Sequence, residues 1–121
     1  MKVVSVGKVP KNVSNSPLFT SNTVTNQPIV PPGLSSVYTS SQVNFPAGVR
    51  NRFHIHSADQ LLIVTAGRGI VATETEQVEV TVGDVIFFPA GEKHWHGATK
   101  DSDFSHVYVT GAGSTTTQVE K

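Results

Sequence analysis

The chain contains no cysteine, carries no net charge and has no long apolar run. The absence of cysteine excludes disulfides, thiolate metal ligands and a cysteine nucleophile. Nine basic and nine acidic residues balance, so the sequence lacks the basic footprint of a protein that binds nucleic acid or an anionic membrane. No segment has the length of a transmembrane helix, and the N-terminus lacks the apolar core of a signal peptide. We therefore expect a cytoplasmic protein without nucleic-acid or membrane partners.

The composition is poor in Leu, Lys and Glu and rich in Val, Thr, Ser, Gly and Pro. This balance is typical of β-proteins with many turns. No segment of ten or more residues shows the periodicity of an amphipathic helix. A chain of 121 residues is long enough for one domain with its own core. The sequence therefore predicts a single all-β domain.

Turn signals divide the chain into short strands. Residues 1–34 are expected to form an N-terminal strand, near residues 2–9, and then an irregular arm that lies over the main domain, and residues 111–121 a flexible tail. Between them we expect strands at residues 35–45, 50–56, 60–65, 70–75, 77–82, 85–88, 94–99 and 104–110, with a turn at Gly67-Arg68-Gly69. Strands at this spacing favour a sandwich or a barrel.

Four of the five histidines lie within residues 48–97, in two clusters. His54 and His56 form the first, and His94 and His96 the second. Residues two apart on a strand share a face, so each pair points in one direction, and a small barrel can bring the pairs together. Imidazole suits divalent transition metals. The joint pattern predicts a metal site, although any one of these histidines alone would more often be a packed or surface residue than a ligand.

Together with the glycines and the proline around them, the two clusters resemble the two signature motifs of the cupin superfamily. They read Gly48-x5-His54-x-His56-x3-Gln60-x6-Gly67 and Gly83-x5-Pro89-x-Gly91-x2-His94-x-His96. The resemblance covers residues 35–110. It implies a single-domain cupin fold, which is a double-stranded β-helix or jelly-roll barrel.

Carried over residue by residue, the resemblance implies one divalent metal ion per chain, held by His54, His56, position 60 and His94. The chain departs from the family at position 60, where Gln60 replaces Glu, and at Ala98, where Asn is usual. A neutral amide leaves the ion its full charge, which weakens binding but makes the ion a stronger Lewis acid.

A narrower resemblance involves residues 60–67 and 89–98. These stretches are similar to small bacterial cupins that include manganese-dependent hydroxynitrile lyases, whose site has three His and one Gln. Manganese is therefore the expected ion, with Fe, Zn or Ni as alternatives. We expect Lewis-acid chemistry in preference to activation of dioxygen.

Five further residues are candidates for the pocket around the metal. His96 and His106 are the candidate catalytic residues, as a proton carrier and as the wall opposite the metal, unless they are only hydrogen-bonded in the barrel wall. Arg52 has the parity of an inward residue and would then recruit a carboxylate, unless it reaches out to the barrel mouth. Val43 and Tyr108 are expected to line the same substrate pocket.

The sequence thus favours a metal-dependent lyase that acts on a small hydroxy or carbonyl compound, in its specific form a cyanohydrin. Two alternatives stay open: an Fe(II)-dependent dioxygenase, and a non-catalytic module that binds or senses a small molecule. The resemblance also implies a homodimer or a higher homo-oligomer.

Overall fold

The computed structural model describes all residues from 1 to 121. It contains ten strands and one turn of 3₁₀-helix: η1 Val6–Lys8, β1 Asn12–Val13, β2 Thr25–Val30, β3 Tyr38–Phe45, β4 His54–His56, β5 Gln60–Thr73, β6 Gln77–Thr81, β7 Val85–Phe88, β8 His94–Ala98, β9 Phe104–Gly111 and β10 Thr116–Gln118. The expected all-β class is confirmed. None of the structure's helices has the length and apolar character needed to cross a membrane.

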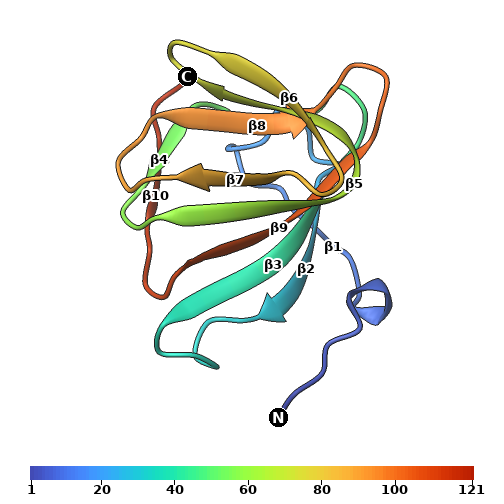
Figure 1. Cartoon of the computed structure of the whole chain (residues 1–121), viewed down its shortest axis with the longest axis vertical. Helices are drawn as coiled ribbons and strands as arrows, with labels where there is room; N and C mark the ends of the chain where they lie inside the picture. Colours follow the sequence, from blue (N-terminus) through green and yellow to red (C-terminus); the bar gives the residue numbers. More distant parts are fainter.

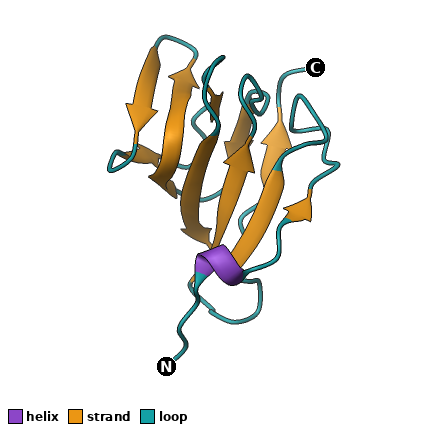
Figure 2. Cartoon of the chain, turned by 90° about the vertical axis from the view of Figure 1, so that its right-hand side faces the viewer, coloured by secondary structure: helices purple, strands orange, loops and turns teal.

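The long strand β5 connects the two halves of the barrel. Its first half pairs antiparallel with β9 and, at its start, with β7, whereas its second half pairs with β6 and β8. The remaining strands extend the sheet in the order β1-β2-β3-β9-β5-β8-β4-β10. Because one strand belongs to both halves, the sheet curls around a common interior (Figures 1 and 2). The predicted single-domain barrel is therefore confirmed.

The expected turn at Gly67-Arg68-Gly69 is wrong, because β5 runs through these residues without interruption. The glycines mark a bend. Gly67 has a positive φ of 68°, and a Cβ there would collide with the carbonyl group of Asp103. A Cβ on Gly69 would lie 2.5 Å from the ring of Phe104. The backbone of β5 therefore passes so close to its neighbours that only glycine fits, and these two glycines lie inside one continuous strand instead of separating two.

The N-terminal arm is more regular than its sequence suggests. Residues 2–9 form no strand, and their only regular element is the helical turn η1. The predicted irregular part instead contains β2, which pairs with β3 across a register shift after Pro28. Gln27 interrupts the apolar pattern of β2, yet it is buried, and its amide donates hydrogen bonds to the carbonyls of Val6 and Val9. The buried position of this strand is thus occupied by a hydrogen-bonded glutamine and not by an apolar residue, so the apolar pattern that predicts a strand is missing.

The C-terminal tail is also ordered. The prediction of a flexible tail is wrong for residues 116–118, which form β10 and pair with β4. The two chain ends lie at opposite ends of the molecule, with the C-terminus near β4 and β10 (Figure 1). The last strand of the chain therefore lies directly beside the strand that carries two of the candidate ligands.

The barrel interior has an apolar part and a polar part. The apolar core consists of Val24, Val43, Phe45, Leu62, Val64, Val71, Val80, Phe88, Ala98 and Phe104. Four histidines are equally inaccessible, at 4% exposure or less: His54, His94, His96 and His106. Polar groups in such an interior are stable only when they are hydrogen-bonded or hold a ligand. The interior therefore points to a site rather than to a purely structural core.

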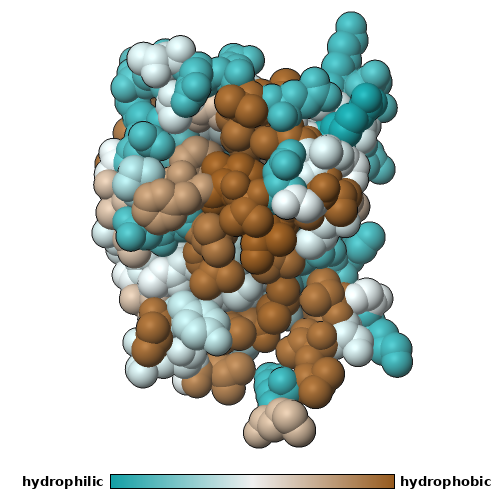
Figure 3. All heavy atoms as spheres, viewed as in Figure 1, coloured by the Kyte–Doolittle hydropathy of each residue, from teal (hydrophilic) through white to brown (hydrophobic).

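The outer surface over β5, β6 and β7 is apolar. Its exposed large side chains are Ile63, Val78, Val85 and Phe87, with Val82 just after β6, and Figure 3 shows apolar residues gathered across this face. A hollow of about 450 Å³ lies there, lined in part by Val78, Val85 and Phe87, and no histidine lines it. This face is separate from the polar interior.

Candidate metal centre

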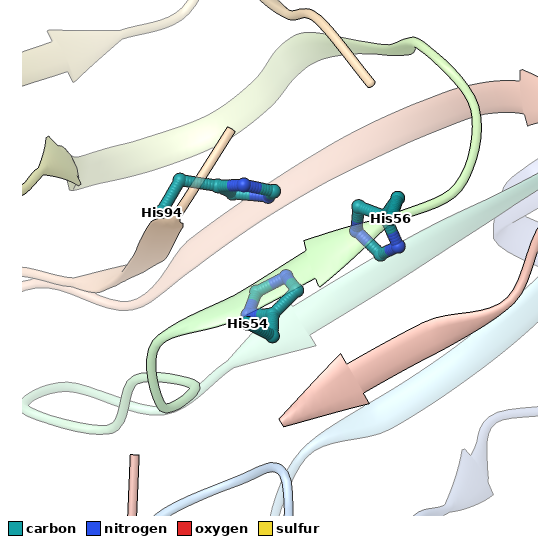
Figure 4. Close-up of side chains that lie close together, drawn as sticks. All are labelled: His54, His56 and His94. Atoms are coloured by element: carbon teal, nitrogen blue, oxygen red, sulfur yellow. The ribbon is translucent and has the colours of Figure 1, made fainter. Parts of the chain in front are cut away.

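Three histidines from two adjacent strands converge at one point of the interior. His54 of β4 lies directly opposite His94 of β8 in the antiparallel pairing, and His56 follows two residues later on the same face of β4. One ring nitrogen from each of the three lies within 4.8 Å of the others, and Figure 4 shows the rings turned toward a common space. The strand pairing thus assembles the two sequence clusters into one group.

Two of these rings are fixed by backbone carbonyls of the segments just before their strands. Nδ1 of His54 lies 2.6 Å from the carbonyl oxygen of Arg52, and Nδ1 of His94 lies 2.8 Å from that of Glu92. A carbonyl oxygen only accepts, so Nδ1 carries the proton in both rings. Nε2 then has a free lone pair, which is the arrangement of a metal-binding histidine held from behind.

The third ring and Gln60 complete the group. Nδ1 of His56 lies 3.0 Å from the Thr116 hydroxyl oxygen. Nε2 of His56, Nε2 of His94 and Oε1 of Gln60 are buried without any hydrogen-bond partner. Unsatisfied buried acceptors of this kind are costly, and a divalent cation would satisfy all of them at once. The residues present therefore fit a metal ion.

Burial keeps the three rings neutral. It lowers the pKa of His54 to about 3 and that of His94 to about 4, with a further contribution from the repulsion between neighbouring imidazoles. Burial also lowers the pKa of His56. Because a histidine binds a metal ion only in its neutral form, these rings are ready to act as ligands throughout the physiological pH range.

A second pair of histidines lies beside the first group. Nε2 of His106 lies 3.1 Å from Nδ1 of His96, so one ring donates and the other accepts. Burial and the mutual repulsion of the two rings hold the pKa of His96 well below its usual range, and burial lowers the pKa of His106 to about 3. Nδ1 of His106 has no partner. The pair can pass a proton along a line of two neutral imidazoles.

Asn51 holds His96 from the other side. Its Oδ1 accepts the backbone N–H of His96 at 2.8 Å, and its Nδ2 lies 3.3 Å from His96 Nε2. Sequence analysis did not identify Asn51, although it lies three residues before His54, in the segment that precedes β4. Nothing in its local sequence distinguishes it from a turn asparagine; only the pairing of its segment with β8 reveals its contact.

A cavity of about 360 Å³ connects both histidine groups. None of the residues that line the cavity is Asp, Glu, Lys or Arg. The lining residues are Leu18, Phe19, Asn26, Pro32, Thr39, Val43, Phe45, Asn51, His54, His56, Gln60, His96, His106, Tyr108, Thr110, Ser114 and Thr116. The structure therefore places Val43, Tyr108, Gln60 and both candidate catalytic histidines around one cavity.

Arg52 does not line this cavity, so its expected place in the substrate pocket is wrong, and the alternative of a guanidinium that turns outward is the one found. Its Nη1 donates to the carbonyl oxygens of Pro17 and Phe19 in the N-terminal arm. Those carbonyls turn the guanidinium away from the interior. The alternation of side chains along a strand does not predict the direction of Arg52, because this residue precedes the first residue of β4. The arm residue Phe19 and the tail residues Ser114 and Thr116 take part in the wall instead.

Comparison with known proteins identifies the family. The cupin domain model matches residues 41–110, which is more than half of the chain. An (R)-mandelonitrile lyase of Granulicella tundricola is 34% identical over 110 residues, which cover 90% of this chain and 83% of the relative. This chain is thus similar to a hydroxynitrile lyase-like cupin over nearly its whole length.

Solved structures agree on the fold. A cupin-like protein of Thermotoga maritima has a TM-score of 0.84 at 26% identity and covers 90% of this chain and 84% of its own. The polyketide cyclase RemF of Streptomyces resistomycificus has a TM-score of 0.88 at 17% identity and covers 100% and 87%. At that identity RemF supports the fold alone. The motifs, the barrel and the matched model agree: this chain belongs to the cupin family.

Proposed function

We propose that the chain is a metal-dependent lyase that cleaves a small, uncharged cyanohydrin to an aldehyde and cyanide. The observation that carries this proposal is the combination of three histidines with free ring nitrogens and a cavity wall without a charged side chain. The similarity to a mandelonitrile lyase at 34% identity supports the same reaction class.

In this proposal His54, His56 and His94 hold one divalent ion, and the Oε1 atom of Gln60 is the fourth ligand. Manganese is the proposed ion, with Fe, Zn or Ni as alternatives. When bound, such an ion supplies Lewis-acid polarisation of a substrate oxygen. The unpartnered acceptors of His56, Gln60 and His94 support this ligand set.

The neutral cavity wall favours a neutral substrate. A carboxylate in the cavity would find no Arg or Lys to pair with, since Arg52 is turned away. Phe45, Val43 and Tyr108 provide apolar surface for a carbon skeleton. A small hydroxy compound with an apolar substituent suits this combination.

His106 and His96 are the proposed proton carriers. The unpartnered Nδ1 of His106 or a ring nitrogen of His96 takes the proton of the substrate hydroxyl, while the oxygen forms the carbonyl double bond. The electrons of the bond to the nitrile carbon leave with cyanide, which takes the proton back. Two neutral rings 3.1 Å apart share the proton between these steps, and Asn51 keeps His96 in place.

The first experiment is to measure the metal content of protein purified without a tag, alongside His56→Ala. About one Mn per chain that is lost in the variant supports the site, and cleavage of mandelonitrile is then followed by the absorbance of benzaldehyde. His106→Gln is expected to retain the metal but to lower kcat about 100-fold, the usual contribution of a proton carrier. Metal-loaded protein that is inactive on a panel of cyanohydrins would refute the proposal. Bound iron with substrate-dependent oxygen uptake would favour a dioxygenase.

We also propose a homo-oligomer that forms through the apolar face of β6 and β7. The acidic residues Glu76, Glu79, Asp84 and Glu92 are among those that line the hollow on this face. Residues 1–11 contain three lysines and no acidic residue, and they project from the barrel in Figure 1. The basic, valine-rich arm of a second copy is therefore complementary to this face in charge and in apolar character. A chain that is monomeric in light scattering at 100 μM would refute this proposal.

A further inference from the structure

The three candidate ligand rings are not held in the same way. His54 and His94 donate to carbonyls two residues earlier, just before their strands begin. His56 instead contacts the hydroxyl of Thr116, which is 60 residues away in sequence. Its orientation therefore depends on the last strand of the chain.

The strand that carries His56 has little other support. β4 is three residues long and pairs with β8 only at His54 and His94. It pairs with β10 along its whole length, with Thr116 opposite His56 and Gln118 opposite His54. Without β10, the outer edge of β4 would be free, and His56 would lose both its hydroxyl partner and its neighbouring backbone.

Hydrogen bonds at both ends hold β10 in place. At its start, the amide of Ser57 donates to the Thr115 carbonyl at 3.0 Å, and the amide of Thr115 donates to the Ser57 hydroxyl at 2.8 Å. Just after its end, a carboxylate oxygen of Glu120 accepts the amide N–H of Phe53 at 2.9 Å. Two such attachments fix the register that places Thr116 next to His56.

An ion pair reinforces the second attachment. Arg50 donates to both carboxylate oxygens of Glu120, at 2.8 and 3.2 Å. The guanidinium carbon of Arg50 also lies 4.6 Å from the centre of the Trp95 ring. Trp95 lies between His94 and His96, so the tail is attached to both strands that carry the three candidate histidine ligands.

We propose that residues 114–120 are part of the metal site and that Thr116 is a positioning residue for the metal ligand His56. In the assigned arrangement the Thr116 hydroxyl accepts the Nδ1 proton of His56, so that Nε2 keeps its lone pair for the ion. A neutral imidazole without such a partner can carry its proton on either nitrogen. A hydroxyl can donate or accept, so Thr116 holds the His56 ring in place in either tautomer. By accepting the Nδ1 proton it favours the tautomer that can bind the metal. This inference rests on the metal site of the proposed function.

The test compares Thr116→Val with Thr117→Val. Valine has the size and β-branched shape of threonine, so the pairing of β10 with β4 is retained. Thr117 points to the opposite face of the same strand and is the matched control. The affinity for Mn²⁺ is measured by competition with a chromophoric chelator. We expect Thr116→Val to bind about 10-fold more weakly, as for other partners that orient metal ligands, and both Thr117→Val and Thr116→Ser to match the parent chain.

A second measurement does not depend on the metal. Nitrogen-15 NMR of the metal-free protein reports which nitrogen of His56 carries the proton. The parent chain and Thr117→Val are expected to show the Nδ1 proton, whereas Thr116→Val shows a shift toward Nε2. Unchanged affinity and unchanged tautomer in Thr116→Val would overturn the inference. If the parent chain binds no metal, the proposed function fails, and the tautomer alone then decides whether Thr116 positions His56.

Discussion

Acid should destabilise the metal-free protein strongly, because the folded chain buries several neutral histidines. His54, His94 and His106 are each 1% exposed, and burial lowers their pKa values to about 3, 4 and 3 respectively. In an unfolded chain each would have a pKa of about 6.5. The unfolded state therefore binds more protons at any pH between these values, so the stability from neutral burial is complete above about pH 6.5 and is lost as the pH falls toward the folded-state values.

The size of the effect follows from the same linkage. Between pH 7 and pH 5, protonation of the unfolded state costs about 2 kcal/mol for each of the three histidines, or about 6 kcal/mol together. That is comparable with the whole free energy of unfolding of a small domain, about 5–15 kcal/mol. The chain is thus expected to approach unfolding near pH 5 when no metal is bound.

Urea unfolding in EDTA, followed by circular dichroism at pH 7, 6 and 5, measures this loss. In His106→Gln one of the three buried imidazoles is absent, so the loss between pH 7 and pH 5 is expected to shrink by about 2 kcal/mol, whatever the variant's stability at pH 7. A loss below about 2 kcal/mol in the parent chain, the share of one histidine, would refute the argument that these rings are buried and neutral.

Three further predictions concern single positions. Gly97→Ala places a Cβ against the backbone of Arg50, with the Val49 carbonyl oxygen 2.7 Å away. This variant is expected to lower the free energy of unfolding at pH 7 by about 1–3 kcal/mol. An unchanged midpoint of urea unfolding would contradict the close approach of the two backbones. Gln60→Glu adds an anionic ligand and is expected to bind Mn²⁺ at least about 10-fold more tightly in titration calorimetry, and equal affinity would show that position 60 is not a ligand. Phe87→Glu is expected to give a monomer in light scattering, because it places charge on the exposed apolar face.

The histidine pattern was sufficient to predict that His54, His56 and His94 lie together. His54, His56 and His94 were placed together because side chains alternate along strands and because two short strands of a barrel can lie side by side. Both facts are local. The pairing of His54 with His94 confirms them, since one antiparallel register brings the two clusters together.

The surroundings of the site could not be predicted in the same way. Asn51, Ser114 and Thr116 reach the cavity through contacts across 45 to 60 residues of sequence or from the tail, and no periodicity marks them. Arg52 was misplaced because strand parity was extended to a residue outside the strand. The tail was misread because Gly, Ser and Thr are typical of both disordered segments and short edge strands, and only the partner strand distinguishes the two.

The absence of charged side chains around the cavity links the role of Gln60 to that of Thr116. Four histidines and Gln60 line a cavity with no ionised side chain, and the ring nitrogen of His94 lies beside those of His54 and His56, so a divalent ion bound there would keep a charge of +2 that no ligand compensates. At about 4 Å, one such unit of charge interacts with an oxygen anion by about 4 kcal/mol at the effective dielectric of a protein site. A glutamate at position 60 would neutralise one unit of the charge of the ion. In the proposed function, Gln60 would therefore weaken the binding of the ion and strengthen its attraction for the negative charge that develops on a substrate oxygen. Because Gln60 would hold the proposed ion less strongly than a carboxylate, the orientation of the three histidines would matter more, and with it the hydrogen bond between Thr116 and His56.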